Sequence, residues 1–270
     1  MKKNGIWIVC ILGMVISLAA YTLPRVTEWV QGSRVQKQVI KEKQKAEEQT
    51  TQESQKNAGQ TKMLPEYTGL YKENPDLIGW LTIDGTVIDY PVMQTPGDED
   101  YYLNYDFYGN RNVNGSLILD TDSVAGTGTA ENSYKDGTRP STNLIIHGHA
   151  MRSGQMFGRL QKYKNEDYGK KHRILKFDSL YEHREYELIA VFYSQVYYKK
   201  DKVFKYYKFF QADTKEEFAD WYENIKKLSL YDTGVTAEFG DEFLTLSCCS
   251  YQVEDGRFVV VAKRIEKNKN

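Results

Sequence analysis

The chain has 270 residues and a formal net charge of −1, from 36 Lys and Arg against 37 Asp and Glu. This balance provides no basic surface of the kind that binds nucleic acid, so a nucleic-acid partner is excluded. The 21 Tyr and 11 Phe favour a β-rich domain. Three cysteines, one of them inside an N-terminal apolar run, are too few for a disulfide framework.

The chain begins with a positively charged segment that is followed by an apolar one. Lys2 and Lys3 precede a stretch from Gly5 to Leu23 that is uncharged and mostly apolar, about the length that a membrane-spanning helix requires. A cleaved signal peptide begins in the same way, but Ser17-Leu18-Ala19 is only a weak cleavage site. We predict a transmembrane anchor in residues 1–25, with a cytoplasmic N-terminus because the positive charges precede the span.

A polar segment separates this predicted span from the rest of the chain. Ser33 to Gln60 is rich in Gln, Lys and Glu and contains no aromatic residue. A segment of this composition cannot bury enough apolar surface to form a core. We therefore predict an extracytoplasmic tether over residues 26–62, whose first part can continue the membrane helix as a solvated stalk. The remaining residues 63–270 suit one domain.

The pattern of this domain predicts strands with short helices inserted between them. The strands are runs of apolar and β-branched residues bounded by turn dipeptides such as Asp84-Gly85. They are predicted at residues 78–83, 87–94, 116–120, 143–146, 173–178, 185–195, 243–246 and 258–261. Short helices are predicted at 65–72 and 98–104, and a long mobile loop at 123–142. Eight strands with inserted helices favour a mainly β, closed or nearly closed mixed barrel.

A longer helix is predicted at residues 214–228. Thr214 and Glu217 form a capping box at its start. Its apolar residues then fall on one face: Phe218, Trp221, Tyr222, Ile225 and Leu228. Because the helix lies between two strands in the sequence, it is expected to pack outside the sheet or to flank a groove.

Two adjacent cysteines end the strand that begins at Phe243. Arg257 starts the next strand, after the Asp255-Gly256 turn. If these strands are neighbours, a thiol and a guanidinium lie at the same end of the sheet, where the cation favours the thiolate. A disulfide between Cys248 and Cys249 is not expected. Successive strand residues point to opposite faces, and Cα atoms ~3.8 Å apart are closer than disulfides usually allow.

Four histidines are available as partners for a thiol. His172 and His183 lie among charged, loop-like residues and are predicted to be solvated. His147 and His149 end a strand and can share one of its sides, because strand side chains repeat every second residue. This spacing is compatible with a His-x-His metal pair, with one His paired to a cysteine, or with packing alone.

Metal ligation requires further ligands that the sequence does not clearly supply. Asp120 and Asp122 are the nearest carboxylates, and they can equally cap a loop. We therefore predict no metal. A Cys–His pair completed by Arg257 is the reading that the combined residues favour.

These residues together resemble the sortase family, and within it class B. Thr245-Leu246-Ser247-Cys248-Cys249 resembles the family's Thr-Leu-Ser/Thr-Thr-Cys motif, and Arg257-Phe-Val-Val-Val-Ala-Lys263 resembles its Arg-led final strand. The segment from Ile145 to Met151 resembles the surroundings of the family's catalytic His. Asn74 to Trp80 and Tyr102 to Phe107 resemble class B segments. The likeness extends from about Met63 to the C-terminus, and the helix inserted before the cysteine strand is a class B trait.

The resemblance implies a role for each matched residue. Cys249, at the last position of the motif, is the expected nucleophile, while Cys248 stands where the family usually has Thr. His149, which follows a Gly, is the expected proton donor and acceptor. Arg257 is expected to hold substrate carbonyls and the developing oxyanion, because a guanidinium does not lose its proton in proteins.

The resemblance also implies a fold and a reaction. The expected protein is a membrane-anchored cysteine transpeptidase with a sortase-type eight-stranded β-barrel and no cofactor. It would cleave a C-terminal sorting motif of secreted proteins after Thr and transfer them, through a thioacyl intermediate, to an amine of a peptidoglycan precursor or of a pilin Lys. Asn104 and Ser247 would contact the substrate. The alternatives are a non-catalytic surface or pilus-assembly protein of the same fold and a hydrolytic cysteine protease.

Overall fold

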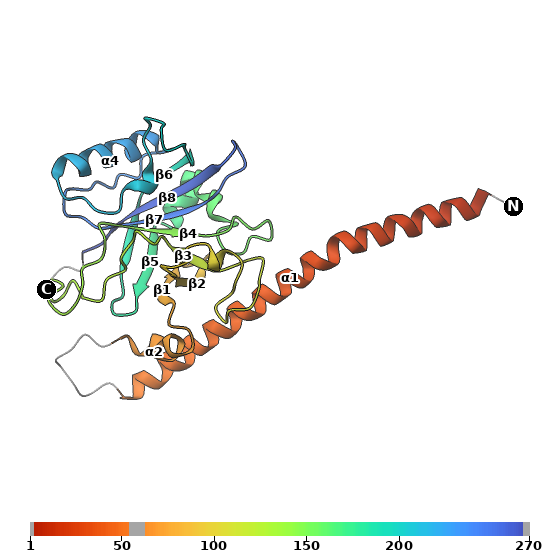
Figure 1. The fold of residues 1–270 in the computed structure, drawn as a ribbon, viewed down its shortest axis with the longest axis horizontal. Helices are drawn as coiled ribbons and strands as arrows, with labels where there is room; N and C mark the ends of the chain where they lie inside the picture. Colours follow the sequence, from red (N-terminus) through yellow and green to blue (C-terminus); the bar gives the residue numbers. More distant parts are fainter. Residues whose placement is uncertain (1–2, 54–62, 267–270) are drawn as a thin grey trace.

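Figure 1 shows the computed structural model, which describes residues 3–53 and 63–266. The side chains of residues 3–12, and of a few later positions in the first helix, are not among the described ones. A domain of strands and short helices occupies one side, and the first helix extends away from it toward the N-terminus.

Eight strands form one closed sheet. They are β1 (Leu77–Thr82), β2 (Asp89–Met93), β3 (Leu117–Leu119), β4 (Asn143–His147), β5 (Ile174–Ser179), β6 (Glu185–Gln195), β7 (Phe243–Cys249) and β8 (Gly256–Arg264). Their order around the sheet is β1-β2-β3-β4-β7-β8-β6-β5, and the antiparallel pairing of β1 with β5 closes it. The predicted mainly β architecture with eight strands and short inserted helices is confirmed.

The short helices lie in the connections between strands. They are α2 (Pro65–Glu73), α3 (Glu166–Lys171) and α4 (Lys215–Leu228), with the 3-10 turns η1 (Tyr101–Leu103), η2 (Leu160–Lys164) and η3 (Tyr206–Lys208). The predicted capping box at the start of α4 is present, since the Thr214 hydroxyl accepts from the Glu217 amide and the Glu217 carboxylate accepts from the Thr214 amide. The sequence did not predict α3, η2 or η3.

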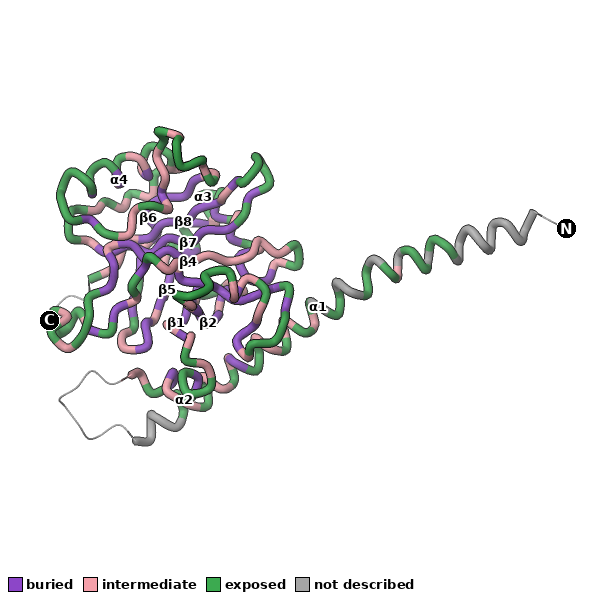
Figure 2. The backbone as a smooth tube through the Cα atoms, viewed as in Figure 1, coloured by how far each residue is buried: buried purple, intermediate pink, exposed green. Residues whose placement is uncertain are grey.

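The strand residues alternate between two apolar clusters. Leu246 and Cys248 of β7 point into the interior of the closed sheet, together with Val260 of β8. Phe243 and Val261 belong to a second cluster, which α4 covers. Figure 2 shows that β7 is buried along most of its length. This alternation fixes the direction of each side chain at the end of β7, including the two adjacent cysteines.

The first helix, α1 (Lys3–Glu53), joins the predicted membrane span and most of the predicted tether in one 51-residue helix. Among the described residues no helix is long and apolar enough to cross a membrane, so the predicted transmembrane helix is not confirmed. The side chains of residues 5–12, which belong to the predicted span, lie outside the described part.

The second half of α1 packs on the domain, although the composition of this segment predicted a tether that cannot form a core. Val39 is only 1% exposed and joins an apolar cluster with Tyr67 and Trp80. The Lys43 ammonium lies 4.9 Å from the centre of the Trp80 ring. The composition of the segment is polar, but its few apolar residues, such as Val35 and Val39, share one helical face. The average composition of the segment therefore did not indicate this packing surface.

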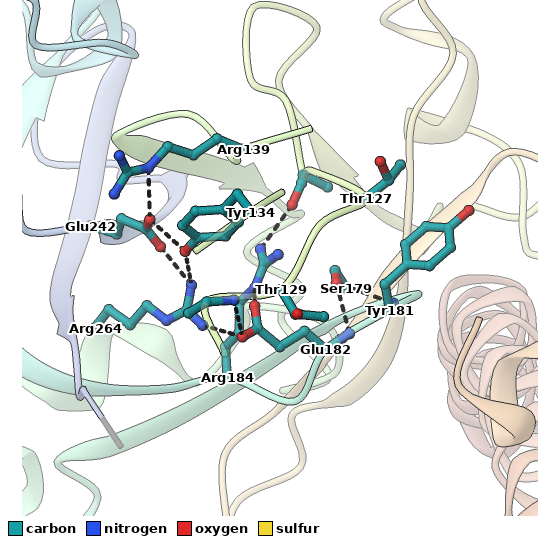
Figure 3. Close-up of polar contacts among 12 residues, drawn as sticks. Thr127, Thr129, Tyr134, Arg139, Ser179, Tyr181, Glu182, Arg184, Glu242 and Arg264 are labelled. Carbon is teal, nitrogen blue, oxygen red and sulfur yellow. Dashed lines mark hydrogen bonds and ion pairs between the residues drawn. The ribbon is translucent and has the colours of Figure 1, made fainter. Parts of the chain in front are cut away.

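A group of largely buried charges lies at the end of the sheet where β7 begins (Figure 3). The Arg264 guanidinium bridges two carboxylates, with its nitrogens 2.7 Å from Glu182 and 2.6 Å from Glu242. The Arg184 side chain, which is fully buried, donates to Glu182 at 2.9 Å. Burial alone would raise the pKa of Glu182, but the amide of Ala130 and the two guanidinium groups hold that pKa below its ordinary value.

These charges anchor the 123–142 loop, which the sequence predicted to be mobile. Arg184 donates to the Ala125 carbonyl at 2.8 Å, and the Ala130 amide donates to Glu182 at 2.9 Å. The Tyr134 hydroxyl donates to Glu242 at 2.6 Å. The loop contains neither helix nor strand, as predicted, but side chains far away in the sequence fix its path.

Candidate active site

The end of β7 presents one cysteine to solvent and one to the interior. Cys249 is exposed and Cys248 is 2% exposed, and both are free thiols. The predicted opposite directions of the two side chains are confirmed. Burial raises the pKa of the Cys248 thiol to about 12, with a further contribution from Cys249 that the Arg257 charge opposes only in part. Cys248 therefore stays protonated near neutral pH, and Cys249 is the accessible thiol.

Arg257 lies directly across from Cys249. β7 and β8 are antiparallel neighbours, and their register pairs these two residues. The half-buried Arg257 side chain donates to the carbonyl oxygens of Asp255 at 3.2 Å and Gly256 at 3.0 Å. Within residues 3–53 and 63–266 no carboxylate forms an ion pair with it. A guanidinium held only by backbone carbonyls keeps further N–H donors for another acceptor.

His149 follows the strand on the other side of β7. β4 runs parallel to β7 with His147 beside Ser247, and the Gly148 amide continues the pairing by donating to the Ser247 carbonyl at 3.2 Å. His149 lies two residues beyond His147, at the same end of the sheet as Cys249. The parallel pairing of β4 with β7 thus brings together residues that lie 100 positions apart in the sequence.

The His149 ring is oriented by a backbone carbonyl that the sequence did not single out. Its Nε2 lies 2.8 Å from the oxygen of Leu103, at the end of η1. A carbonyl only accepts hydrogen bonds, so Nε2 carries the proton in this contact. The Nδ1 atom is then the nitrogen left to exchange a proton with a substrate.

His147 is paired with a carboxylate instead of with the thiol. Its Nε2 lies 3.0 Å from Asp120, which also accepts from the Asp122 amide. Burial would raise the pKa of Asp120, but the His147 ring and the Asp122 amide bring that pKa below its ordinary value. Asp120 therefore caps a local turn, which was one of the readings that the sequence left open. No group of three or more metal-ligating side chains occurs in the described part of the chain.

The other two histidines differ from each other in exposure. His172 is 8% exposed, and its Nδ1 lies 2.9 Å from the Asp84 carbonyl, so the prediction of a solvated residue is wrong. The ring packs against Tyr168 of α3, a helix that the sequence did not predict. The His183 ring is half exposed and lies 3.0 Å from Asp178. Neither residue belongs to the group around Cys249.

The two predicted substrate contacts have different surroundings. Asn104 is exposed and directly follows Leu103, whose carbonyl holds His149. Ser247 is 1% exposed, and its hydroxyl forms a 2.7 Å hydrogen bond with the Tyr206 hydroxyl. Its burial does not support a direct contact with a substrate. Burial raises the pKa of Tyr206, so its hydroxyl stays protonated. The sequence did not predict a role for Tyr206, because η3 has no distinctive pattern.

An accessible thiol, an oriented imidazole and a guanidinium without a carboxylate partner therefore converge on one end of the closed sheet. Such a group can supply a nucleophile, a proton carrier and a cation for a developing negative charge. The site residues come from three neighbouring strands and their ends, and η1 adds the carbonyl that orients the imidazole.

Comparisons with known proteins show what the chain as a whole is similar to. The Sortase domain model matches residues 81–265. The chain is 31% identical over 204 residues to Sortase B of Listeria monocytogenes, covering 75% of each protein. It is 28% identical over 209 residues to Sortase B of Staphylococcus aureus, covering 77% of this chain and 78% of that protein. The crystal structure of sortase B from B. anthracis in complex with AAEK1 superposes with a TM-score of 0.67 at 27% identity, covering 89% of this chain and 99% of that one.

Proposed function

Since the chain belongs to the sortase family and is a class B sortase, we propose that it transfers secreted proteins that carry a C-terminal sorting signal to an amine. The observation that carries this proposal is the exposed thiol of Cys249, which lies across from Arg257 in the β7–β8 register. The acceptor amine belongs to a peptidoglycan precursor or to a pilin Lys.

The proposed reaction uses the three residues in two steps. The Cys249 thiolate attacks the carbonyl carbon of the Thr in the sorting motif. The peptide C–N bond after that Thr breaks as protonated His149 gives its proton to the leaving amine. The acceptor amine then attacks the thioacyl carbon, His149 takes the amine's proton, and the C–S bond breaks. Arg257 donates to the oxyanion that forms in each step.

We also propose that the protein is attached to a membrane through the apolar segment from Gly5 to Leu23, with the domain outside the cytoplasm. The support is the sequence, in which positive charges precede an uncharged apolar run. Attachment would hold enzyme and substrate in one membrane and raise their effective concentration. A protein that remains in the membrane fraction after a high-salt wash would support this location, whereas a shortened soluble form would contradict it.

The proposed transfer is tested with a peptide that carries a sorting motif and with an added amine. Cys249→Ala should lower turnover by more than about a thousandfold, because the other described thiol, Cys248, is buried. The matched variant Cys248→Thr should keep most of the activity, since that side chain points into the interior. Mass spectrometry of the thioacyl enzyme and of the new amide product measures both effects. Full activity of Cys249→Ala would exclude the assigned nucleophile.

The same assay separates the alternatives. Cleavage that an added amine stimulates, with a new amide product, supports transfer. Cleavage by water alone, unaffected by amines, would indicate a hydrolytic cysteine protease. A protein that binds the peptide without cleaving it would indicate a non-catalytic member of the fold.

A further inference from the structure

The middle of α1 is fixed against the domain by a single face of the helix. Gln36 donates to the carbonyl oxygens of Val87 at 3.3 Å and Asp89 at 3.4 Å, and Val39 is buried one turn further on. Gly32 lies at the start of this face. A Cβ added there would overlap with the side-chain amide nitrogen of Asn114. A glycine in a helix interior weakens the helix, so its presence here permits a close approach.

Gln155 connects this face of α1 to the domain. Gln155 is 8% exposed, and its side chain is satisfied at both ends. The Asn114 amide donates to its oxygen at 2.7 Å, and its own amide donates to the Ser33 hydroxyl of α1 at 2.7 Å. Asn114 is itself 4% exposed, so α1, Asn114 and Gln155 form one buried hydrogen-bonded chain. The Gln155 side chain also contacts the Trp29 carbonyl at 3.4 Å and the Ser153 hydroxyl at 3.5 Å. Removal of Gln155 therefore leaves the buried Asn114 side-chain amide without this partner.

The segment after Gln155 holds the backbone of His149. Met156 pairs with Ala150 in an isolated bridge, and the Phe157 amide donates to the His149 carbonyl at 3.0 Å. Met156 has a φ of 50°, a left-handed conformation that is strained for a residue with a side chain. Its amide donates to the Tyr90 hydroxyl at 3.0 Å. A strained conformation of this kind persists only when its neighbours enforce it.

We propose that Gln155 is a positioning residue for His149 and that α1 acts on the active site through it. The Leu103 carbonyl orients the His149 ring from one side, and the 155–157 segment holds its backbone from the other. α1 supports that segment through Ser33 and the Gln155 side chain. This inference rests on the proposed function, because it assigns His149 the proton transfers of that reaction. The N-terminal helix then helps to position His149, in addition to the membrane attachment proposed above.

The test uses the full-length chain in detergent, with the sorting-motif peptide and an amine. Gln155→Ala should lower kcat about tenfold while KM changes less than about twofold, because a displaced general acid slows chemistry without weakening binding. Ser33→Ala should give a smaller loss in the same parameter. The double variant should lose no more than Gln155→Ala, since both changes break one chain of contacts.

A pair of glycine variants provides the matched control. Gly32→Ala and Gly69→Ala both place a methyl group in a helix, but only the first meets Asn114, while nothing lies within 4 Å of a Cβ at Gly69. Gly32→Ala should lower kcat and Gly69→Ala should not. An unchanged kcat in Gln155→Ala would overturn the proposal. So would losses that follow the melting temperature across all the variants, because they would report general destabilisation.

A measurement that needs no turnover separates this proposal from the proposed function. In histidine-labelled protein, Gln155→Ala should shift the His149 imidazole resonances in NMR spectra and leave those of His183 unchanged. If the parent enzyme transfers no peptide, the proposed function fails, but these resonances still report whether Gln155 positions His149. Unchanged His149 resonances would overturn the positioning role even in an active enzyme.

Discussion

The strands β7 and β8 carry charged or reactive residues at both of their ends, and the two ends are built differently. At one end, Glu242 and Arg264 belong to a buried group in which the bridging guanidinium contacts two carboxylates. At the other, Arg257 contacts only backbone carbonyls and lies across from the exposed Cys249. A cation that carboxylates already neutralise fixes structure, whereas one without such a partner can stabilise charge that develops on a substrate.

The largest expected effect on stability comes from breaking the ion pairs at the end of the strands where Glu242 and Arg264 lie. Arg184→Ala should lower the free energy of unfolding by about 3–5 kcal/mol, because it removes one partner from a buried ion pair and frees the 123–142 loop. Activity per folded molecule should change little, since these charges lie far from Cys249 along the strands. Chemical denaturation measures the first quantity, and titration of active thiols with the substrate assay measures the second.

An exposed ion pair serves as the control for this variant. Arg173 lies 3.6 Å from Glu187, and its side chain is 66% exposed. Arg173→Ala should therefore cost less than about 1 kcal/mol. Equal losses in the two variants would show that burial of the Arg184 charges does not determine the stability of the loop.

Removal of the Arg257 guanidinium should affect the rate of the proposed reaction more than the stability of the fold. Arg257→Ala should lower kcat about a hundredfold, as expected for the loss of an oxyanion donor, while the free energy of unfolding changes by less than about 1 kcal/mol. Arg257→Lys should recover only part of the rate, because one ammonium cannot reproduce the guanidinium fork.

The pH dependence of kcat/KM distinguishes two roles for Arg257. If it holds the oxyanion, the rate of Arg257→Ala falls and both limbs of the bell-shaped profile stay in place. If the limb of the profile that is assigned to Cys249 moves to higher pH while the maximum rate is unchanged, Arg257 instead favours the thiolate. The proposed oxyanion role of Arg257 would then be wrong.

A further test of the same charges concerns the pH dependence of stability. The pKa of Glu182 is lowered in the folded protein, so this carboxylate stabilises the fold above its unfolded pKa of about 4.3. That contribution is lost as the pH falls through the folded value. The melting temperature of Glu182→Gln should lie below that of the parent from pH 6 to 5, and the difference should shrink below about pH 4. A constant difference down to pH 3 would show that the charge of Glu182 is not the stabilising feature.

The elements that the sequence predicted correctly depend on local patterns. The strand ending at Cys249 alternates apolar residues with a period of two, and this period also places Cys248 inside and Cys249 outside. The capping box and the apolar face of the segment from Lys215 to Leu228 predict the helix that the structure contains. Each of these signals lies within a few residues of the element that it describes, so no knowledge of the fold was required.

The features that escaped prediction depend on contacts between distant segments. Whether α1 is a solvated spacer or a packed helix depends on Trp80 and Gln155, which no property of residues 26–62 reveals. The carbonyl that orients His149 belongs to Leu103, and the hydroxyl that covers Ser247 belongs to Tyr206. The sequence by itself determined the strands, the helix α4 and the candidate residues of the site. Only the closed sheet decided their partners, because hydrogen bonding and burial depend on which segments the fold brings together.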